Sequence, residues 1–263
     1  MRIGYIQNDP LFGEKEENFK GIRTLVRDVH ADLLVLPELF ATGYAFTSRD
    51  EALAMAETDR GPTFLFLKEL SGSTGATMVG GFIERENDRI YNSLLIVSGD
   101  RVIGSYRKIH LFYKEHFWFA PGDRMPAVYE INGVRIGVMI CFDWIFPEVC
   151  RALALKGMQV LAHPANLVML HCQNAMVTRC LENGIFAVTA NRTGSEQRGE
   201  DHFVFTGSSQ VTGNDGRILS SAPADVPQVS VVEIDEKRAD HKLITPYNDV
   251  LKDRRPGLYD ISS

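Results

Sequence analysis

Three segments of the chain place a side chain that could react beside a run of apolar residues typical of a β-strand. Glu38 follows one such run, Lys108 stands at the end of a second, and Cys141 ends a third. In α/β proteins functional side chains gather at the carboxyl ends of strands, so we take these residues as candidates. The junction after Cys141 strengthens the case for the thiol, because Pro147 suits the first turn of a following helix.

Together these side chains could attack a carbonyl carbon. A thiol with an ordinary pKa of about 8.5 is only a few per cent thiolate at neutral pH, so Cys141 needs a base. Glu38 could take the thiol proton, because removal from water would raise the pKa of its carboxyl group toward a useful range. Lys108 could stabilise the oxyanion that the attack creates, and free backbone N–H groups after Cys141 could bind it as well.

Each of these residues also has a purely structural interpretation, and a different thiol chemistry stays open. Glu38 could begin a surface loop, Lys108 could extend into solvent, and Cys141 could fill a core. A Cys–His pair, as in a Cys–His peptidase, would use His110 or His163, although no spacing supports that pairing specifically. We expect the remaining cysteines to pack as inert thiols within helices. They are Cys150, Cys172 and Cys180.

The composition excludes several classes of protein. The chain has 263 residues, of which 44% are hydrophobic and 24% charged, with a formal charge of −6, as in an ordinary globular protein. The acidic balance argues against nucleic acid as a partner, because phosphate contacts need clustered Lys and Arg. No apolar run reaches the roughly 18 residues of a membrane span, and no signal-peptide pattern is present. Without CxxC pairs or metal-ligand spacing, we expect free thiols in a reducing cytoplasm and no metal site.

Hydrophobic periodicity predicts an α/β protein in which helices cover sheets. The predicted strands are 2–7, 32–36, 76–83, 90–97, 102–108, 128–131, 134–140, 160–162, 185–190, 204–212 and 229–234. The predicted helices are 14–29, 63–71, 147–156 and a segment near 172–183. Hairpin signals alternate with crossover helices, which indicates mixed sheets rather than a pure parallel barrel. No linker divides the chain, so we expect one domain over 1–263 with an irregular charged tail over 247–259.

Ordered blocks of sequence resemble the nitrilase superfamily of carbon–nitrogen hydrolases. The blocks are PELF (37–40), TGY (42–44), YRKIHL (106–111), CFD (141–143), FPE (146–148), ALKG (154–157) and HPAN (163–166). The match runs nearly end to end, and the ordered set is far more specific than any block alone. The chain is most similar to short nitrilase-like proteins of thermophilic archaea, with which it shares CFDW (141–144) and AHPANLV (162–168).

The resemblance implies a four-layer α-β-β-α sandwich and a role for each residue in the matching blocks. It implies Glu38 as general base and acid, Lys108 as transition-state stabiliser and Cys141 as nucleophile. It also implies that the backbone N–H of Phe142 binds the oxyanion and that Glu115 orients the lysine and the substrate. The weaker pocket candidates, by position, are Tyr44, Phe117, Trp144 and Asn166.

The resemblance also bears on substrate and assembly. Dedicated nitrilases usually carry Trp-Glu after the cysteine, whereas this chain has Phe142-Asp143, which favours a small amide or N-carbamoyl substrate. Hydrolysis of small aliphatic nitriles is the alternative. A non-catalytic family member that binds a metabolite or partner is the alternative from a different class. The resemblance implies no cofactor, and it implies a homodimer in which the tail 246–263 contributes to the interface.

Overall fold

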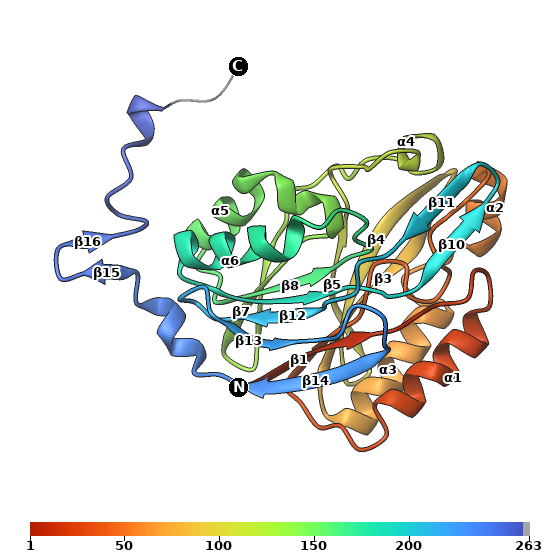
Figure 1. Ribbon diagram of the computed structural model, residues 1–263, viewed down its shortest axis with the longest axis horizontal. Helices are drawn as coiled ribbons and strands as arrows, with labels where there is room; N and C mark the ends of the chain where they lie inside the picture. The colour runs from red at the N-terminus through yellow and green to blue at the C-terminus, as the bar shows by residue number, and fades with distance from the viewer. Residues whose placement is uncertain (260–263) are drawn as a thin grey trace.

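Two six-stranded mixed sheets form the centre of the computed structural model, which describes residues 1–259 (Figure 1). The first sheet has the order β14 (Gln228–Glu233), β1 (Arg2–Gln7), β2 (Leu33–Val35), β3 (Thr77–Glu86), β4 (Arg89–Ser98) and β5 (Arg101–Arg107). The second has the order β13 (Ile218–Ser221), β12 (Gln210–Thr212), β9 (Phe186–Ala190), β8 (Val160–Pro164), β7 (Val134–Val138) and β6 (Val128–Ile131). Strands β1, β2 and β3 are parallel, as are β7, β8 and β9, so each set shares one carboxyl edge.

Helices cover the outer face of each sheet and complete four layers. Helices α1 (Lys15–Leu25) and α3 (Pro62–Thr74) pack on the first sheet. Helices α5 (Pro147–Leu155) and α6 (Cys172–Asn183) pack on the second, on the opposite side of the molecule (Figure 1). The predicted α-β-β-α sandwich is therefore confirmed. Within residues 1–259, no helix has the length and apolar character needed to cross a membrane.

Alternating side chains explain why the central strands are apolar on both faces. Ile3 and Tyr5 of β1 join the apolar cluster between the two sheets, whereas Ile6 joins the cluster under α1 and α3. Val35 of β2 likewise faces the second sheet, and the adjacent Leu34 faces the helices. Successive side chains of a strand point to opposite faces, so a strand covered on both sides must be apolar throughout.

The first helix is shorter than the sequence pattern predicts. Phe19, Ile22 and Val26 are spaced for one helical face and are all buried. The helix nevertheless ends at Leu25, before the predicted end at residue 29. A tight turn, closed by a hydrogen bond from the Val29 N–H to the Val26 carbonyl, carries the chain toward β2 instead.

Several short elements were not expected from periodicity. They are α2 (Arg49–Met55), α4 (Glu115–Trp118), the 3₁₀ turns η1 (Cys141–Ile145), η2 (Glu236–Asp240) and η3 (Pro256–Leu258), and the hairpins β10 (Ser195–Arg198) with β11 (Asp201–Val204) and β15 (Leu243–Thr245) with β16 (Asn248–Asp249). The predicted strand over 204–212 is wrong, because β11 ends at Val204 and β12 begins only at Gln210. Gly207 and Ser208, with φ of 53° and 52°, interrupt the extended backbone between them.

The carboxy-terminal tail leaves the layered body (Figure 1). Strand β16, which pairs with β15, and the turn η3 give order to part of the segment 247–259 that was expected to be irregular. Of the predicted interface tail 246–263, the structure describes residues up to 259, and residues 260–263 lie outside the described part.

The backbone segments after β2 and within β3 approach each other unusually closely. A Cβ atom at Gly81 would lie 2.5 Å from the Leu39 nitrogen and 2.7 Å from the Glu38 Cα. Real Cβ contacts do not reach such distances, so only glycine fits here without a backbone shift. This close approach holds Glu38 and Leu39, in the segment after β2, directly against β3.

We expect Gly81→Ala to lower the free energy of unfolding by about 1–3 kcal/mol, because the added methyl group forces the two segments apart. Gly72→Ala is the matched control, since Gly72 is exposed in α3 and its Cβ would meet nothing within 4 Å. That control should raise stability by about 0.5–1 kcal/mol. Urea denaturation measures both variants, and equal stability of Gly81→Ala and the native chain would contradict the close approach.

Candidate active site

Three loops that follow strands bring Glu38, Lys108 and Cys141 to one region. Glu38 follows β2, Lys108 directly follows β5, and Cys141 follows β7 and opens η1. Lys108 contacts Glu38, and the charges of both residues lie close enough to Cys141 to shift the pKa of its thiol. All three side chains are buried or nearly so, at 0%, 0% and 6% exposure.

The Lys108 ammonium lies between two carboxylates. Its Nζ donates to Glu38 Oε1 at 2.7 Å and to Glu115 Oε1 at 2.8 Å. Burial disfavours the charged ammonium, but the two carboxylates outweigh that effect and hold the pKa of Lys108 above its ordinary value. Lys108 is therefore a fixed cation that neither neighbour can easily deprotonate.

Glu38 has one oxygen that is bonded and one that is free. Oε1 accepts from Lys108 and from Asn92 Nδ2, the latter at 2.7 Å. Oε2 is buried and has no hydrogen-bond partner among the described residues. Buried carboxylate oxygens are rarely left unpaired, so this oxygen is available for a proton from a thiol or a water.

Glu115 accepts hydrogen bonds from three sides. Besides Lys108, the Tyr44 hydroxyl donates to its Oε1 at 2.8 Å, and the Phe112 N–H donates to its Oε2 at 3.1 Å. Burial raises the pKa of Glu115 to about 7, although Lys108 acts in the opposite direction. Burial and the nearby carboxylates also raise the pKa of Tyr44, so its hydroxyl remains a donor.

Cys141 sits on a strained turn with its thiol protonated. Its φ of 41° lies in the left-handed region, which costs a non-glycine residue about 1–3 kcal/mol and is typical of functional turns. Burial and the charge of Glu38 raise the pKa of the thiol well above its usual value, while Lys108 and the Asn166 backbone N–H oppose them. For the sulfur to act as a nucleophile it would have to lose this proton, and the unpaired oxygen of Glu38 is a carboxylate oxygen that could accept it.

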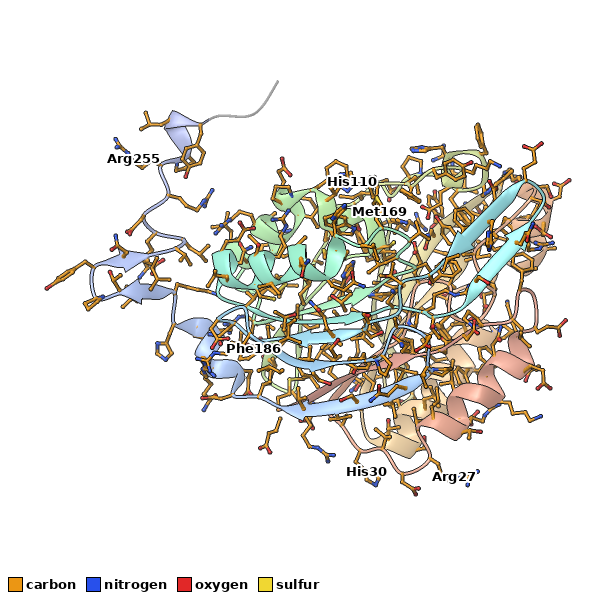
Figure 2. The ribbon with its side chains drawn as sticks, in the orientation of Figure 1. Arg27, His30, His110, Met169, Phe186 and Arg255 are labelled. Atoms are coloured by element: carbon orange, nitrogen blue, oxygen red, sulfur yellow. The ribbon has the colours of Figure 1, made fainter. Side chains whose placement is uncertain are left out.

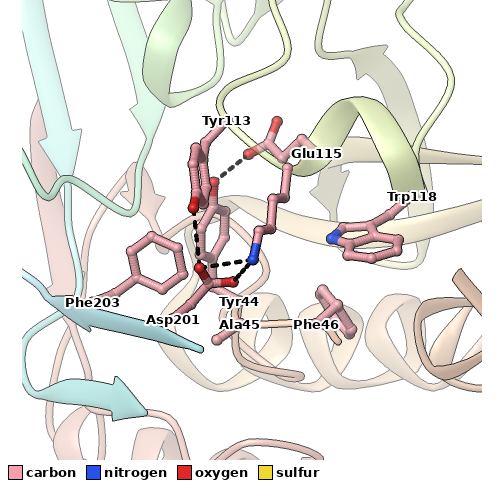
Figure 3. A pocket seen from close by; sticks show the side chains of 9 residues that line it. Tyr44, Ala45, Phe46, Tyr113, Glu115, Trp118, Asp201 and Phe203 are labelled. Atoms are coloured by element: carbon pink, nitrogen blue, oxygen red, sulfur yellow. Dashed lines mark hydrogen bonds and ion pairs between the residues drawn. The ribbon is translucent and has the colours of Figure 1, made fainter. Parts of the chain in front are cut away.

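A small hollow opens beside Cys141. It encloses about 220 Å³ and is lined by Phe112, Cys141, Phe142, Trp144, Asn166, Leu167, Val168 and Met169, the last of which is labelled in Figure 2. Three predicted pocket residues, Phe142, Trp144 and Asn166, therefore lie together here. Tyr44 and Glu115 line a second hollow of about 230 Å³, which the β10–β11 hairpin borders through Asp201 and Phe203 (Figure 3).

The structure does not bring Phe117 to either hollow. The side chain is 68% exposed and lines an outer groove with Thr47 and Arg198. Glu115 and Phe117 share the single helical turn α4, and residues two apart on a helix point in nearly opposite directions. Because Glu115 faces inward to Lys108, Phe117 faces outward, away from both hollows.

The two histidines of the alternative Cys–His pair have other partners. His163 Nε2 lies 3.0 Å from the Cys141 carbonyl oxygen, and its Nδ1 lies 3.2 Å from Thr189 Oγ1. His110 Nδ1 lies 2.8 Å from Asp143 Oδ1, and the ring stacks on Phe146. Both histidines therefore support the backbone around the thiol, while the charged neighbours of the thiol are Glu38, Lys108 and Glu115.

Sequence reasoning missed Asp143 as a positioning residue. Its carboxylate, wholly buried, accepts from Tyr106 Oη at 2.8 Å and from the Ile140 N–H at 2.9 Å, in addition to its contact with His110. One side chain thus joins the end of β5, which leads to Lys108, to the turn that carries Cys141. The residues around Asp143 do not distinguish a buried carboxylate from an exposed one, because its partner Tyr106 is on β5, which is distant in sequence.

Two further buried polar residues also escaped the sequence analysis. Asn92, which bonds Glu38, is followed by Ser93, and this polar pair interrupts the apolar residues of β4, a signal that could have revealed it. Glu196 of β10 accepts from the backbone N–H groups of Tyr44 and Ala45, at 3.0 and 2.7 Å, and pairs with Arg192. Glu196 thereby holds the loop that presents Tyr44 to Glu115.

The other cysteines differ from Cys141 in their surroundings. Cys150, Cys172 and Cys180 are free and buried in the apolar cluster around α5 and α6. Burial raises the pKa of Cys150 to about 12 and the pKa values of the other two well above their usual range. Across residues 1–259, no group of three or more His, Cys, Asp or Glu side chains is arranged to hold a metal ion.

Comparison with known proteins gives the family. Residues 2–241 match the carbon–nitrogen hydrolase family. The chain is 43% identical to a nitrilase of Pyrococcus abyssi, over 98% of this chain and 99% of that protein. It is 36% identical to an (R)-stereoselective amidase of Pseudomonas, over 85% and 80% of the two chains. A solved structure of a mutant Nesterenkonia amidase from the nitrilase superfamily superimposes with a TM-score of 0.79, at 26% identity, over 98% and 95% of the two chains.

The chain therefore belongs to the carbon–nitrogen hydrolase family, within the nitrilase superfamily. The resemblance inferred from its sequence blocks is confirmed. The names of its relatives include both nitrilase and amidase, so family membership defines the kind of bond that is cleaved and leaves the substrate to be argued from the site.

The burial of His163 predicts that the free energy of unfolding depends on pH. Burial lowers its pKa from 6.5 to about 4, so the folded state holds the ring neutral over a range in which the unfolded state would protonate it. The unfolded chain binds more protons between these values, so this stabilisation is complete above about pH 6.5 and is lost as pH falls toward 4. The expected loss between pH 7 and pH 5 is about 2 kcal/mol.

His163→Gln should reduce the difference between the unfolding free energies at pH 7 and pH 5 by about that amount. Urea denaturation at each pH measures it. His30→Gln, at an exposed position on the periphery of the molecule (Figure 2), is the control and should retain the native pH dependence. An unchanged pH dependence in His163→Gln would show that His163 is not held neutral.

Proposed function

We propose that this protein hydrolyses a non-peptide C–N bond of a small amide or N-carbamoyl compound through a thioester on Cys141, with release of ammonia. The observation that carries the proposal is the buried Lys108 ammonium, bonded to Glu38 at 2.7 Å and to Glu115 at 2.8 Å, beside the thiol. This arrangement supplies a base, an oxyanion partner and a nucleophile in one region.

The first half of the reaction forms the thioester. The Cys141 thiol gives its proton to Glu38 as the sulfur bonds to the substrate carbon, and the carbonyl electron pair moves onto oxygen. Lys108 and the backbone N–H of Phe142 stabilise that oxyanion. Glu38 then gives the proton to the departing nitrogen, the C–N bond breaks, and ammonia leaves.

The second half of the reaction consumes water. Glu38 takes a proton from a water molecule as the water oxygen bonds to the thioester carbon, and Lys108 again stabilises the oxyanion. When the intermediate collapses, the carbon–sulfur bond breaks and the Cys141 sulfur recovers the proton held by Glu38. Glu115 holds Lys108 in position in both halves, and none of these steps uses a cofactor.

Nitrile hydrolysis is the second candidate, and the 43% identity to a protein named nitrilase supports it. Attack of Cys141 on a nitrile carbon would give a thioimidate, and addition of water with loss of ammonia would then lead to the same thioester. The Phe142-Asp143 pair after the nucleophile, in place of Trp-Glu, is why we place amides and N-carbamoyl compounds first. A non-catalytic binding protein is the remaining alternative.

We further propose a cytoplasmic homodimer in which residues 1–263 act as one domain. The described carboxy-terminal segment 243–259 supports this assembly, because it leaves the layered body (Figure 1). Several of its large apolar side chains are exposed to solvent. They are Leu243, Ile244, Tyr247 and Leu258. A second copy of the chain would remove this apolar surface from water.

Cys141→Ala should lower ammonia release by at least about 10³-fold on every substrate, because removal of a nucleophile disables the whole catalytic unit. The assay screens aliphatic amides, N-carbamoyl amines and aliphatic nitriles, and intact mass of quenched native enzyme should show an acyl adduct on Cys141. Cys150→Ala, at a buried thiol outside the site, is the control and should remain active. Full activity of Cys141→Ala would overturn the assignment, and no release from any class would favour the binding protein.

Glu38→Gln and His110→Gln separate this mechanism from a Cys–His enzyme. Loss of the general base should lower kcat by about 10²–10⁴-fold in Glu38→Gln. His110→Gln should lower it by less than about tenfold, because His110 contacts Asp143 and not the reacting atoms. The reverse order of effects in steady-state kinetics would instead identify a Cys–His pair.

A further inference from the structure

Two side chains beside Cys141 carry buried polar atoms that have no partner. Both amide atoms of Asn166, Nδ2 and Oδ1, lack a hydrogen bond within residues 1–259, and so does the indole Nε1 of Trp144. Asn166 is 4% exposed and Trp144 is 7% exposed, and both line the hollow that contains Cys141. Buried polar atoms are nearly always paired in folded proteins, so these three atoms are available to a bound molecule.

The position of Asn166 indicates which part of a substrate it meets. Asn166 and Cys141 line the same hollow, and the backbone N–H of Asn166 lowers the pKa of the thiol, so the residue adjoins the sulfur. In the proposed mechanism the oxygen of the scissile group contacts Lys108, and its nitrogen takes a proton from Glu38. The side-chain amide of Asn166 is therefore left for the remainder of the substrate, beyond the scissile carbon.

This hollow is small and its walls carry no charge. The space between its walls is about 220 Å³ and is partly open to solvent, so it accepts only a short chain. Its lining consists of apolar and aromatic residues, the thiol and Asn166. The charged residues of the hollow beside Glu115, Lys114 and Asp201, pair with each other at 2.7 Å and offer no unpaired charge.

We infer that Asn166 selects short, uncharged substrates whose far end carries a second carboxamide. This inference rests on the proposed function and specifies the substrate of that same site. A carboxamide presents one acceptor and one donor group, which match Nδ2 and Oδ1 of Asn166 in a pair of antiparallel hydrogen bonds. The Trp144 Nε1–H supplies a further donor to the same carbonyl oxygen.

Substrates with a different group at the far end leave some of the polar atoms of Asn166 and Trp144 unpaired. A carboxylate could accept from Nδ2 and from the indole, but it would face the lone pairs of Oδ1. An ammonium could donate to Oδ1, but it would leave both donors without an acceptor. An alkyl group would leave all three atoms unpaired. A site with buried hydrogen-bonding groups rejects ligands that cannot pair them, because each unpaired group retains its desolvation penalty.

The test compares four amides of matched chain length that differ only at the far end. They are succinamide, succinamate, 4-aminobutyramide and butyramide. We expect kcat/KM for succinamide, after a twofold correction for its two equivalent amides, to exceed each of the others by about tenfold or more. Ammonia release measures all four under the same conditions.

Two variants of Asn166 test the residue itself. Asn166→Leu, of similar volume, should lower the succinamide-to-butyramide ratio of kcat/KM by about tenfold. Asn166→Asp keeps the shape and should shift preference from succinamide toward 4-aminobutyramide, because a carboxylate attracts an ammonium. Asn214→Leu, on the turn between β12 and β13, is the matched control and should keep the native ratio. Circular dichroism of each variant verifies that it is folded.

The outcomes separate this inference from the proposed function. A native enzyme that hydrolyses butyramide as well as succinamide, or Asn166 variants with the native ratio, would overturn the role of Asn166 and leave the proposed function standing. If folded native enzyme releases no ammonia from any of the four amides, the inference fails, and the Cys141 assay decides the proposed function separately.

Discussion

A fully buried ammonium group must be surrounded by anionic or polar partners, and Lys108 finds two carboxylates, Glu38 and Glu115, within hydrogen-bond distance. Such a cluster is weak as a source of stability, because the desolvation of its charges offsets much of their attraction. The main effect of the cluster is to fix the positions of its three side chains. The ion pair joins residues 70 positions apart, so the first sheet has to form before the cluster exists.

Neighbouring side chains hold the members of this cluster in fixed positions relative to one another. Asp143 joins Tyr106, near Lys108, to the turn of Cys141, while Asn92 fixes one oxygen of Glu38 and leaves the other unpaired. The contact between Asp143 and Tyr106 connects the second sheet to the first. Burial raises the pKa of the Cys141 thiol, so the proposed mechanism, in which the thiol transfers its proton during the attack, depends on that alignment.

The two sides of the site differ in physical character. On one side the charges of Lys108, Glu38 and Glu115 are held by mutual hydrogen bonds, and they suit any substrate in which a carbon bonded to nitrogen is attacked. On the other side an uncharged hollow offers the unpaired atoms of Trp144 and Asn166. Relatives named nitrilase and amidase within one superfamily fit this division, since the reacting groups can stay the same while the hollow changes.

The sequence by itself predicted sheets covered by helices and the candidates Glu38, Lys108 and Cys141, because period-two and helical patterns are local and strand ends follow from them. The four-layer arrangement came from the resemblance of its sequence blocks to a known family. Only the tertiary structure decided which buried polar groups pair. It turned Phe117 outward, and it gave the Asn166 amide no hydrogen-bond partner among residues 1–259. Hydrogen-bond partners depend on which distant segments become neighbours, and a local pattern carries no record of that choice.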